Sequence, residues 1–317
     1  MRTSVVRLCG LLAVLACSPE GDTADNTARL VVYNAAAIAR PIRVVLDSFA
    51  TRTRTRYEQE TAASLELARK VIDLGGEPDV IVLADPEIFP KLLEPNHVRW
   101  HVVFARNRIV LAYTPRSKGA SEINATNWFR ILSWRGVEVG RSDPHTDPSG
   151  YRTLLVWQLA ERYYGEPRLA ARMLKASPPR NVRPREADQV ALLTAGEYDY
   201  AWTYENLAKS AGFSYVKLPD AIDLGNPADS ANYGLASVRV QGKTPNDSII
   251  FTGRPILFAV SILNSARSET LAERFVAFLL SADGQRILRS QSFDALSSPV
   301  LAGQGIPVTV RASVTSQ

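Results

Sequence analysis

Short apolar segments alternate with longer amphipathic segments along most of this chain, and that alternation constrains the fold more than any single motif does. Residues 79–84 read Asp-Val-Ile-Val-Leu-Ala, an almost continuously apolar run that is typical of a strand buried on both faces of a parallel sheet. Residues 41–50 instead repeat apolar side chains at helical spacing. Because strands that alternate with helices form parallel sheets with right-handed crossovers, we expect an α/β fold.

Other segments fit the same alternation. We expect strands at residues 30–33, 108–113, 137–140, 199–204, 214–218 and 255–263, and helices at residues 65–74, 151–164, 185–194, 268–280 and 284–290. Ligands of such sheets bind beyond the carboxyl ends of the strands, where loops lead into helix N-termini. The chain has no G-x-G-x-x-G, Walker A or G-x-S-x-G motif, so the nucleotide and serine-hydrolase sites that use those motifs are not indicated.

The composition is ordinary for a globular protein and does not indicate nucleic-acid binding. The 317 residues are 46% hydrophobic, which is enough for one large or two medium domains, and the formal net charge is +5. A basic run occurs at residues 52–56 (Arg-Thr-Arg-Thr-Arg), but no aromatic residue is interleaved with it. We therefore interpret the run as a solvated face and expect no nucleic-acid partner.

The N-terminus has the features of an export signal. Arg2 and Arg7 accompany an apolar stretch that is too short to span a bilayer stably but suits a signal peptide. The stretch ends Val-Leu-Ala-Cys at residues 14–17, which resembles the lipobox of bacterial lipoproteins. We expect residues 1–16 to be removed, Cys17 to be acylated and the polar residues 17–28 to form a flexible tether. The alternative is a cytosolic protein with an apolar N-terminal helix.

The residues that most enzymes of this size would need are scarce. The two cysteines, Cys9 and Cys17, both lie in the first 17 residues, and there are three histidines, His97, His101 and His145. Beyond residue 17, a disulfide, a cysteine zinc site and a cysteine nucleophile are therefore excluded, and a His-rich metal site is not indicated. No nucleophile with a base and an orienting group is evident, so we expect a binding protein and not an enzyme.

The loop at residues 141–150 leaves an expected strand and enters an expected helix. Asp147 precedes Pro148, which places the carboxylate at the cap of that helix. Backbone N–H groups of the first helical residues then face the loop, an arrangement that suits an anion or a carboxylate. The plainer alternative is that Asp147 only caps its own helix.

Other segments could line a site together with that loop. Glu186 lies near another helix start, where alone it indicates a capped surface helix. Ala63 and Ser64 precede a helix, and Ala37 follows the first strand, so small residues there let a ligand approach the backbone closely. Tyr204 ends a strand and could offer its hydroxyl, although aromatic residues in strands belong more often to the core.

From about residue 30 to residue 299 the chain resembles the tungstate- and molybdate-binding proteins of ABC importers, in their archaeal-type branch. The most specific stretches are residues 139–144 (Val-Gly-Arg-Ser-Asp-Pro), 147–154 (Asp-Pro-Ser-Gly-Tyr-Arg-Thr-Leu) and 163–167 (Tyr-Tyr-Gly-Glu-Pro). The resemblance implies the two-lobed, type II periplasmic-binding-protein fold, with a mainly parallel sheet in each lobe and a two-strand hinge. Lobe 1 would comprise residues 29–112 plus 255–317, and lobe 2 residues 113–254.

The resemblance also implies site residues. Matched by motif, Asp147 and Glu186 would bind the metal centre of the oxyanion directly, making it six-coordinate, and Ser64 and Tyr204 would lie near it. Two buried carboxylates would repel a dianion such as sulfate or phosphate. Direct bonds to a high-valent metal change that balance, because the charge of the metal itself then counts. The pair therefore favours a metal oxyanion.

Some positions depart from the family pattern. Ala36 and Ala37 stand where Gly-Ser is usual, Ala63 stands where Gly is usual, and Ser149 stands where Cys is frequent. Losing one hydrogen-bond donor to a ligand costs about 1–3 kcal/mol unless Asn34 or a water replaces it.

The resemblance further implies an exported, periplasmic protein that is monomeric and needs no cofactor. It would bind tungstate or molybdate, deliver the ion to an ABC permease and meet the membrane only through a lipid at Cys17. The alternatives are the same fold with another small anion, and a sensory lipoprotein that no longer feeds a transporter. An acid–base hydrolase built on Asp147 and Glu186 is the least favoured.

Overall fold

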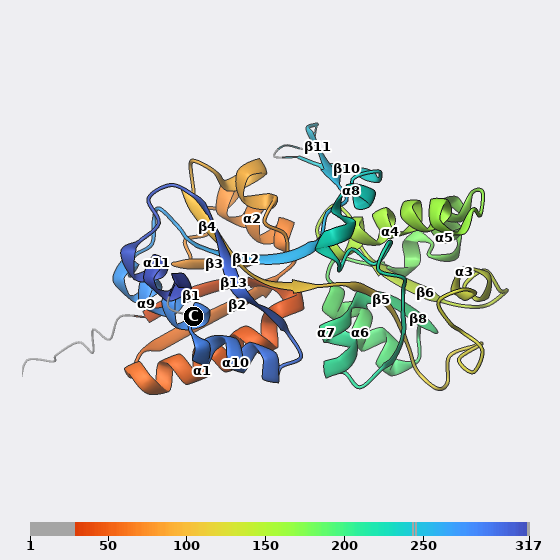
Figure 1. Cartoon of the computed structure of the whole chain (residues 1–317), viewed down its shortest axis with the longest axis horizontal. Coiled ribbons are helices and arrows are strands. Elements are labelled where there is room, and N and C mark those ends of the chain that lie inside the picture. Colours follow the sequence, from red (N-terminus) through yellow and green to blue (C-terminus); the bar gives the residue numbers. More distant parts are fainter. Residues whose placement is uncertain (1–28, 243, 245, 316–317) are drawn as a thin grey trace, which may run out of the picture.

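Two sheets, each covered by helices, divide the chain into two lobes that lie side by side (Figure 1). The structure is a computed structural model that describes residues 29–242, 244 and 246–315. The signal peptide (1–16), Cys17 and the tether (17–28) that the sequence predicts lie outside these described residues. No helix among the described residues is long and apolar enough to cross a membrane.

Lobe 1 is built on a six-stranded sheet. In spatial order its strands are β13 (Asp294–Gly303), β4 (Trp100–Asn107), β12 (Ile256–Ile262), β3 (Val80–Leu83), β1 (Arg29–Ala35) and β2 (Arg56–Ala62). Its helical segments are η1 (Ala36–Ile38), α1 (Ala39–Thr53), α2 (Ser64–Asp73), η2 (Phe89–Leu93), α9 (Glu269–Leu280), α10 (Ala282–Ser290) and α11 (Val308–Thr315).

Lobe 2 is built on a five-stranded sheet. In spatial order its strands are β7 (Val182–Arg183), β6 (Val139–Ser142), β8 (Tyr200–Tyr204), β5 (Ile109–Tyr113) and β9 (Ser214–Lys217). Its helical segments are α3 (Trp128–Ile131), α4 (Pro148–Tyr164), α5 (Leu169–Ala176), η3 (Pro179–Asn181), α6 (Glu186–Ala195), α7 (Glu205–Ser210), η4 (Pro227–Asp229) and α8 (Ser230–Tyr233). A separate hairpin of β10 (Ser237–Gln241) and β11 (Ser248–Thr252) projects beside the junction of the lobes (Figure 1).

The predicted α/β class and the two lobes are confirmed, but the prediction of a mainly parallel sheet in each lobe is wrong, because both sheets are mixed in strand direction. Strands β1, β2 and β3 run parallel, as do β6, β7 and β8. Strands β4, β5, β12 and β13 pair with antiparallel neighbours. The reason is topological: β5 and β12 enter their sheets directly from the other lobe, and only crossover helices impose parallel pairing.

The chain passes between the lobes at Arg108, where β4 ends and β5 begins, and returns before β12 (Figure 1). The predicted division after residue 112 cuts through β5, all of which pairs inside the lobe 2 sheet. Sheet membership therefore moves this boundary back to Arg108. The misplacement arose because residues 108–113 form one apolar strand in the sequence, and nothing in that pattern marks which sheet the strand joins.

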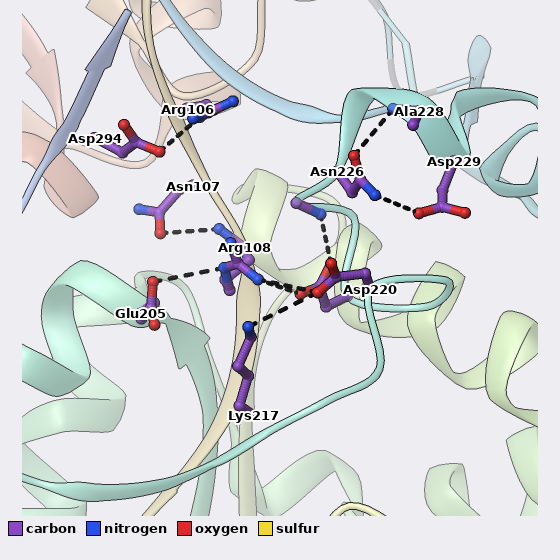
Figure 2. Close-up of polar contacts among 12 residues, drawn as sticks. Arg106, Asn107, Arg108, Glu205, Lys217, Asp220, Asn226, Ala228, Asp229 and Asp294 are labelled. Carbon is purple, nitrogen blue, oxygen red and sulfur yellow. Dashed lines mark hydrogen bonds and ion pairs between the residues drawn. The ribbon is translucent and has the colours of Figure 1, made fainter.

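An ion-pair network surrounds this crossing (Figure 2). The Arg108 guanidinium lies 2.9 Å from Asp223, 3.4 Å from Asp220 and 3.5 Å from Glu205. Burial raises the pKa of the Asp223 carboxyl to about 6, against the opposing effects of the Gly225 N–H and of Arg108. A Cβ at Gly225 would lie 2.8 Å from the Arg108 Cβ, so only glycine lets the two crossing segments approach this closely.

Aromatic packing fixes the sheet of lobe 2 against α4. The Trp202 ring of β8 packs edge-to-face against Trp128 at 5.2 Å and Trp157 at 5.9 Å, and all three side chains are buried. Such edge-to-face pairs contribute beyond the area they bury. This packing therefore holds α4, and the loop that leads into it, firmly against the lobe 2 sheet.

Candidate functional site

Asp147 begins α4 and links it to α6. Its Oδ1 accepts a hydrogen bond from the Ser149 N–H at 2.8 Å, and its Oδ2 accepts one from the Glu186 N–H at 3.0 Å. The simple capping interpretation is thus correct for one oxygen, while the other reaches a second helix start. The two helix N-termini therefore stand together and share one carboxylate.

Glu186 is the first residue of α6, and its side chain is fully buried. Its Oε1 accepts from the Thr203 hydroxyl at 2.6 Å and from the Tyr204 N–H at 2.5 Å. Its Oε2 has no hydrogen-bond partner among the described residues. Burying a carboxylate oxygen without a partner costs folding free energy, so we expect a bound ligand to contact this atom.

Burial raises the pKa of both carboxyl groups. It raises the pKa of Glu186 well above the usual range, and the neighbouring charge of Asp147 raises it further. Burial also raises the pKa of Asp147, although the N–H bonds from Ser149 and Glu186 act in the opposite direction. The Arg152 guanidinium lowers the pKa of both groups. A strongly positive centre between the two carboxyls would therefore favour their ionised forms.

Lobe 1 meets this pair mainly with backbone and one hydroxyl. The Ser64 Oγ at the start of α2 accepts from the Ala84 N–H at 3.0 Å, which leaves the hydroxyl hydrogen for another acceptor. The Leu65 N–H donates to the Thr146 carbonyl at 3.1 Å, so the segments of Ser64 and Asp147 adjoin. Ala63, the residue before α2, is buried in the same place.

Ala37 also lies at the boundary between the lobes. It belongs to η1, which contacts α6, and its carbonyl accepts from the Asn206 side chain of lobe 2 at 2.9 Å. Asn34 directs its amide nitrogen to the Ala35 carbonyl, and its side-chain oxygen accepts from Gln59. Those two bonds hold the Asn34 side chain on β1 and β2, so its polar groups are used within the lobe 1 sheet.

Tyr204 lies at the end of β8 with its side chain fully buried. Its hydroxyl oxygen accepts from Arg152 at 2.7 Å, so its own hydrogen is directed elsewhere. Ser149 differs, because its hydroxyl donates to Ser142 at 2.9 Å and its N–H to Asp147. The hydroxyl hydrogen of Ser149 is therefore used inside lobe 2, unlike those of Ser64 and Tyr204.

Sequence reasoning missed Arg152, Asp85 and Thr203. Arg152 was quoted only as part of a motif, and its buried guanidinium now links Tyr204 with the Ala84 carbonyl and the Asp85 carboxylate of lobe 1. A strongly apolar helix carrying one arginine on its inner face was the available signal, because an arginine is rarely buried without partners.

The candidate residues are enclosed where the two lobes meet. Ser64, Asp147, Glu186 and Tyr204 are all buried, and hydrogen bonds run between the lobes around them. We refer to these four residues as the interlobe site. Among the described residues, no group of three or more His, Cys, Asp and Glu side chains could hold a metal ion.

Comparison with known proteins gives consistent results. The family model described as bacterial extracellular solute-binding protein matches residues 30–294. An uncharacterized solute-binding protein from Petrotoga mobilis is 38% identical over 276 residues, which cover 87% of this chain and 86% of the relative. The molybdate/tungstate-binding protein WtpA from Pyrococcus abyssi is 30% identical over an alignment of 341 positions, gaps included, that covers 98% of this chain and 97% of the relative.

Solved structures agree on the fold. The periplasmic molybdate-binding protein of Azotobacter vinelandii superposes with a TM-score of 0.56 at 15% identity, covering 83% of this chain and 98% of the other. The sulfate-binding protein SubI of Mycobacterium tuberculosis gives a TM-score of 0.59 at 13% identity, covering 90% of this chain and 89% of the other. At such identities the likeness extends to the two-lobed architecture only.

Proposed function

Because this chain belongs to the bacterial extracellular solute-binding protein family, we propose that it captures tungstate or molybdate between its lobes and delivers the ion to an ABC permease. The ligand would enter when the lobes separate and be enclosed when they close about the two crossing segments. Binding would occur without turnover and without a cofactor.

The unpartnered Oε2 of Glu186 is the observation that carries this proposal. It belongs to a buried carboxylate that stands beside a second one, Asp147. An oxyanion of a light element would meet repulsion from both, whereas a tungsten or molybdenum centre can accept their oxygens as ligands. The pair therefore favours a metal oxyanion over sulfate or phosphate.

Hydrogen-bond donors suited to the oxo groups lie beside the pair. The hydroxyl hydrogens of Ser64 and Tyr204 are both left over from the bonds that their oxygens accept. Further support comes from the relatives at 30% identity in Pyrococcus abyssi and Thermococcus kodakarensis, which are named molybdate/tungstate-binding proteins. At Ala37 a hydrogen-bond donor is missing, because the family pattern has a hydroxyl there. That loss favours a second candidate function, in which the same fold binds another small anion.

Isothermal titration calorimetry on residues 27–317 separates these candidates. We expect tight binding of tungstate and of molybdate, with no heat from sulfate or phosphate. Glu186→Gln is the matched variant, because it keeps the size and one acceptor oxygen while removing the charge. Binding of sulfate or phosphate with equal strength would favour the second candidate, and silence with all four ions would exclude transport of any of them.

The remaining parts of the proposal concern location and assembly. We propose that the protein is held outside the cytoplasm by a lipid on Cys17 and acts as a monomer, on the strength of residues 14–17 and of the family. A Cys17→Ser variant should be released from membranes, which fractionation measures. Light scattering on the soluble form should give the mass of one chain.

A further inference from the structure

Arg152 joins the two lobes through a buried guanidinium. Its Nη1 donates to the Ala84 carbonyl at 2.6 Å and to the Tyr204 hydroxyl at 2.7 Å, and its Nη2 lies 3.1 Å from the Asp85 carboxylate. Ala84 and Asp85 follow β3 in lobe 1, whereas Arg152 and Tyr204 belong to lobe 2. The residue is 3% exposed, so solvent does not substitute for these partners.

The neighbouring residue strengthens the same contact. The Tyr151 hydroxyl donates to the same Asp85 oxygen at 2.5 Å, so two consecutive residues of α4 hold the end of β3. Charge-assisted hydrogen bonds in a buried setting are among the strong ones, and all of those to Ala84 and Asp85 must break when the lobes separate. The contacts to Ala84 and Asp85 therefore stabilise the closed form and not the open one.

The bond to Tyr204 has a directional consequence. Because the phenol oxygen accepts from Arg152, the hydroxyl hydrogen points away from the guanidinium. The Tyr204 backbone N–H is bound to Glu186 Oε1, so this tyrosine stands next to the carboxylate whose other oxygen is unpartnered. The guanidinium thus fixes the orientation of a donor within the interlobe site.

We propose that Arg152 is a positioning residue that links site occupancy to lobe closure: it holds Tyr204 as a donor toward the ligand and bridges to Ala84 and Asp85 only when the lobes are closed. The orientation of Tyr204 toward the ligand (the positioning half) rests on the proposed function. The bridge to Ala84 and Asp85 (the closure half) does not. A planar guanidinium reaches all three partners at once, which a lysine ammonium cannot do in the same geometry.

The closure half is tested by the distance between the lobes. The chain has no cysteine beyond residue 17, so Leu74→Cys in lobe 1 and Ala171→Cys in lobe 2 give a clean pair for spin labels at exposed positions. We expect Arg152→Met to lower the ratio of short to long interlobe distances at least about fivefold relative to the labelled parent. Arg162→Met, an exposed arginine on the same helix, should leave the ratio unchanged. An unchanged ratio in Arg152→Met overturns the closure half.

The positioning half is tested by a double-mutant cycle on tungstate and molybdate affinity. We expect Arg152→Met to weaken binding at least about thirtyfold and Arg152→Lys to recover only part of that loss. Tyr204→Phe should weaken binding in the parent but cause little further loss in Arg152→Met, since its donor is already misdirected. Full additivity of the two substitutions overturns the positioning half.

These outcomes also separate this inference from the proposed function. If the parent binds neither oxyanion, the proposed function fails, and the distance measurement still decides the role of Arg152 in closure. If Arg152→Met does not fold, as judged by circular dichroism, Asp85→Asn removes the lobe 1 charge and leaves Arg152 with Tyr204. It should shift the distances in the same direction by a smaller factor, and unchanged distances in that variant overturn the proposal.

Discussion

Buried carboxylates occur both in the interlobe site and at the crossing between the lobes, and they differ in one respect. At the crossing, Asp223 is fully buried, but its oxygens accept from Arg108 at 2.9 Å and from the Gly225 N–H at 2.7 Å. In the interlobe site, Glu186 is equally buried and one of its oxygens has no partner among the described residues.

The difference shows that burial and a raised pKa do not by themselves mark a ligand site. Burial raises the pKa of Asp223 and of Glu186 alike. What distinguishes them is whether the protein itself completes the hydrogen bonds of the carboxylate. A completed carboxylate stabilises a structural junction, and an incomplete one is available to a ligand.

The largest expected effect comes from the incomplete carboxylate and its neighbour. Glu186→Ala or Asp147→Ala should weaken tungstate and molybdate binding more than about a hundredfold, since each removes a charged ligand of the metal centre. The fold should persist, because the hydrophobic core is untouched. Calorimetry measures the affinity, and thermal unfolding checks the fold.

Asp223→Asn is the matched substitution of the completed carboxylate. It should change affinity by no more than about threefold, because this side chain contacts no interlobe-site residue. Equal affinity losses at Asp223 and at Glu186 would contradict the distinction between the two sites.

The next effect concerns pH and the crossing. The pKa of Asp223 is raised from 3.8 to about 6, so the folded protein holds this proton more tightly than the unfolded chain does. Its contribution to stability is fully present below pH 3.8 and is lost as the pH rises through about 6. Between pH 7 and pH 4 the unfolding free energy of the parent should therefore rise by about 1–3 kcal/mol relative to Asp223→Asn.

Denaturant unfolding of both proteins at each pH measures this difference. Taking the difference removes the effects of Asp147 and Glu186, which both proteins share. A difference that falls toward acid pH would mean that Arg108, and not burial, governs the Asp223 carboxyl.

A smaller loss is expected at Ser64 in lobe 1. Ser64→Ala should weaken oxyanion binding about tenfold, because it removes one neutral donor, and it should also leave the Ala84 N–H without its partner. Ser142→Ala is a suitable control, since it removes a buried hydroxyl that bonds only within lobe 2. Calorimetry should show lower affinity for Ser64→Ala alone.

The smallest effect is a gain at Ala37. Ala37→Ser should tighten binding by up to about fivefold by restoring a donor of the family pattern. Ala36→Ser, at the buried neighbouring position, tests whether the effect is specific. If neither variant changes the affinity, η1 contributes no side-chain donor to the ligand, and the lobe 1 contribution comes from α2 alone.

The sequence predicted many of the apolar or periodic parts of the fold, but it missed the buried and largely apolar strand β4. The strand at residues 79–84 corresponds to β3 (Val80–Leu83), and the helix at residues 151–164 to α4 (Pro148–Tyr164). Strands β2 and β13 were not predicted, because each lies at an edge of the lobe 1 sheet and has polar, partly exposed residues. Edge strands pair on one side only, so they carry a weaker apolar pattern.

The candidate site was predictable in its residues but not in its connections. The motif around Asp147 and the helix start at Glu186 both led to buried carboxylates. The bond between the Glu186 N–H and Asp147 joins positions 39 residues apart, and no local pattern encodes it. The partners of Arg152 lie in two separate segments, and only the packing of one lobe on the other brings Ala84 and Asp85 to it.

The bond between the Glu186 N–H and Asp147 has a consequence for the order of events in time. Both carboxylates are aligned by contacts inside lobe 2, namely those to Ser149, Thr203 and Tyr204. They stay aligned while the lobes are apart, so the first encounter with the ion takes place on lobe 2 alone. Substitutions in lobe 1 should then leave the association rate nearly constant and shorten the residence time of the ion.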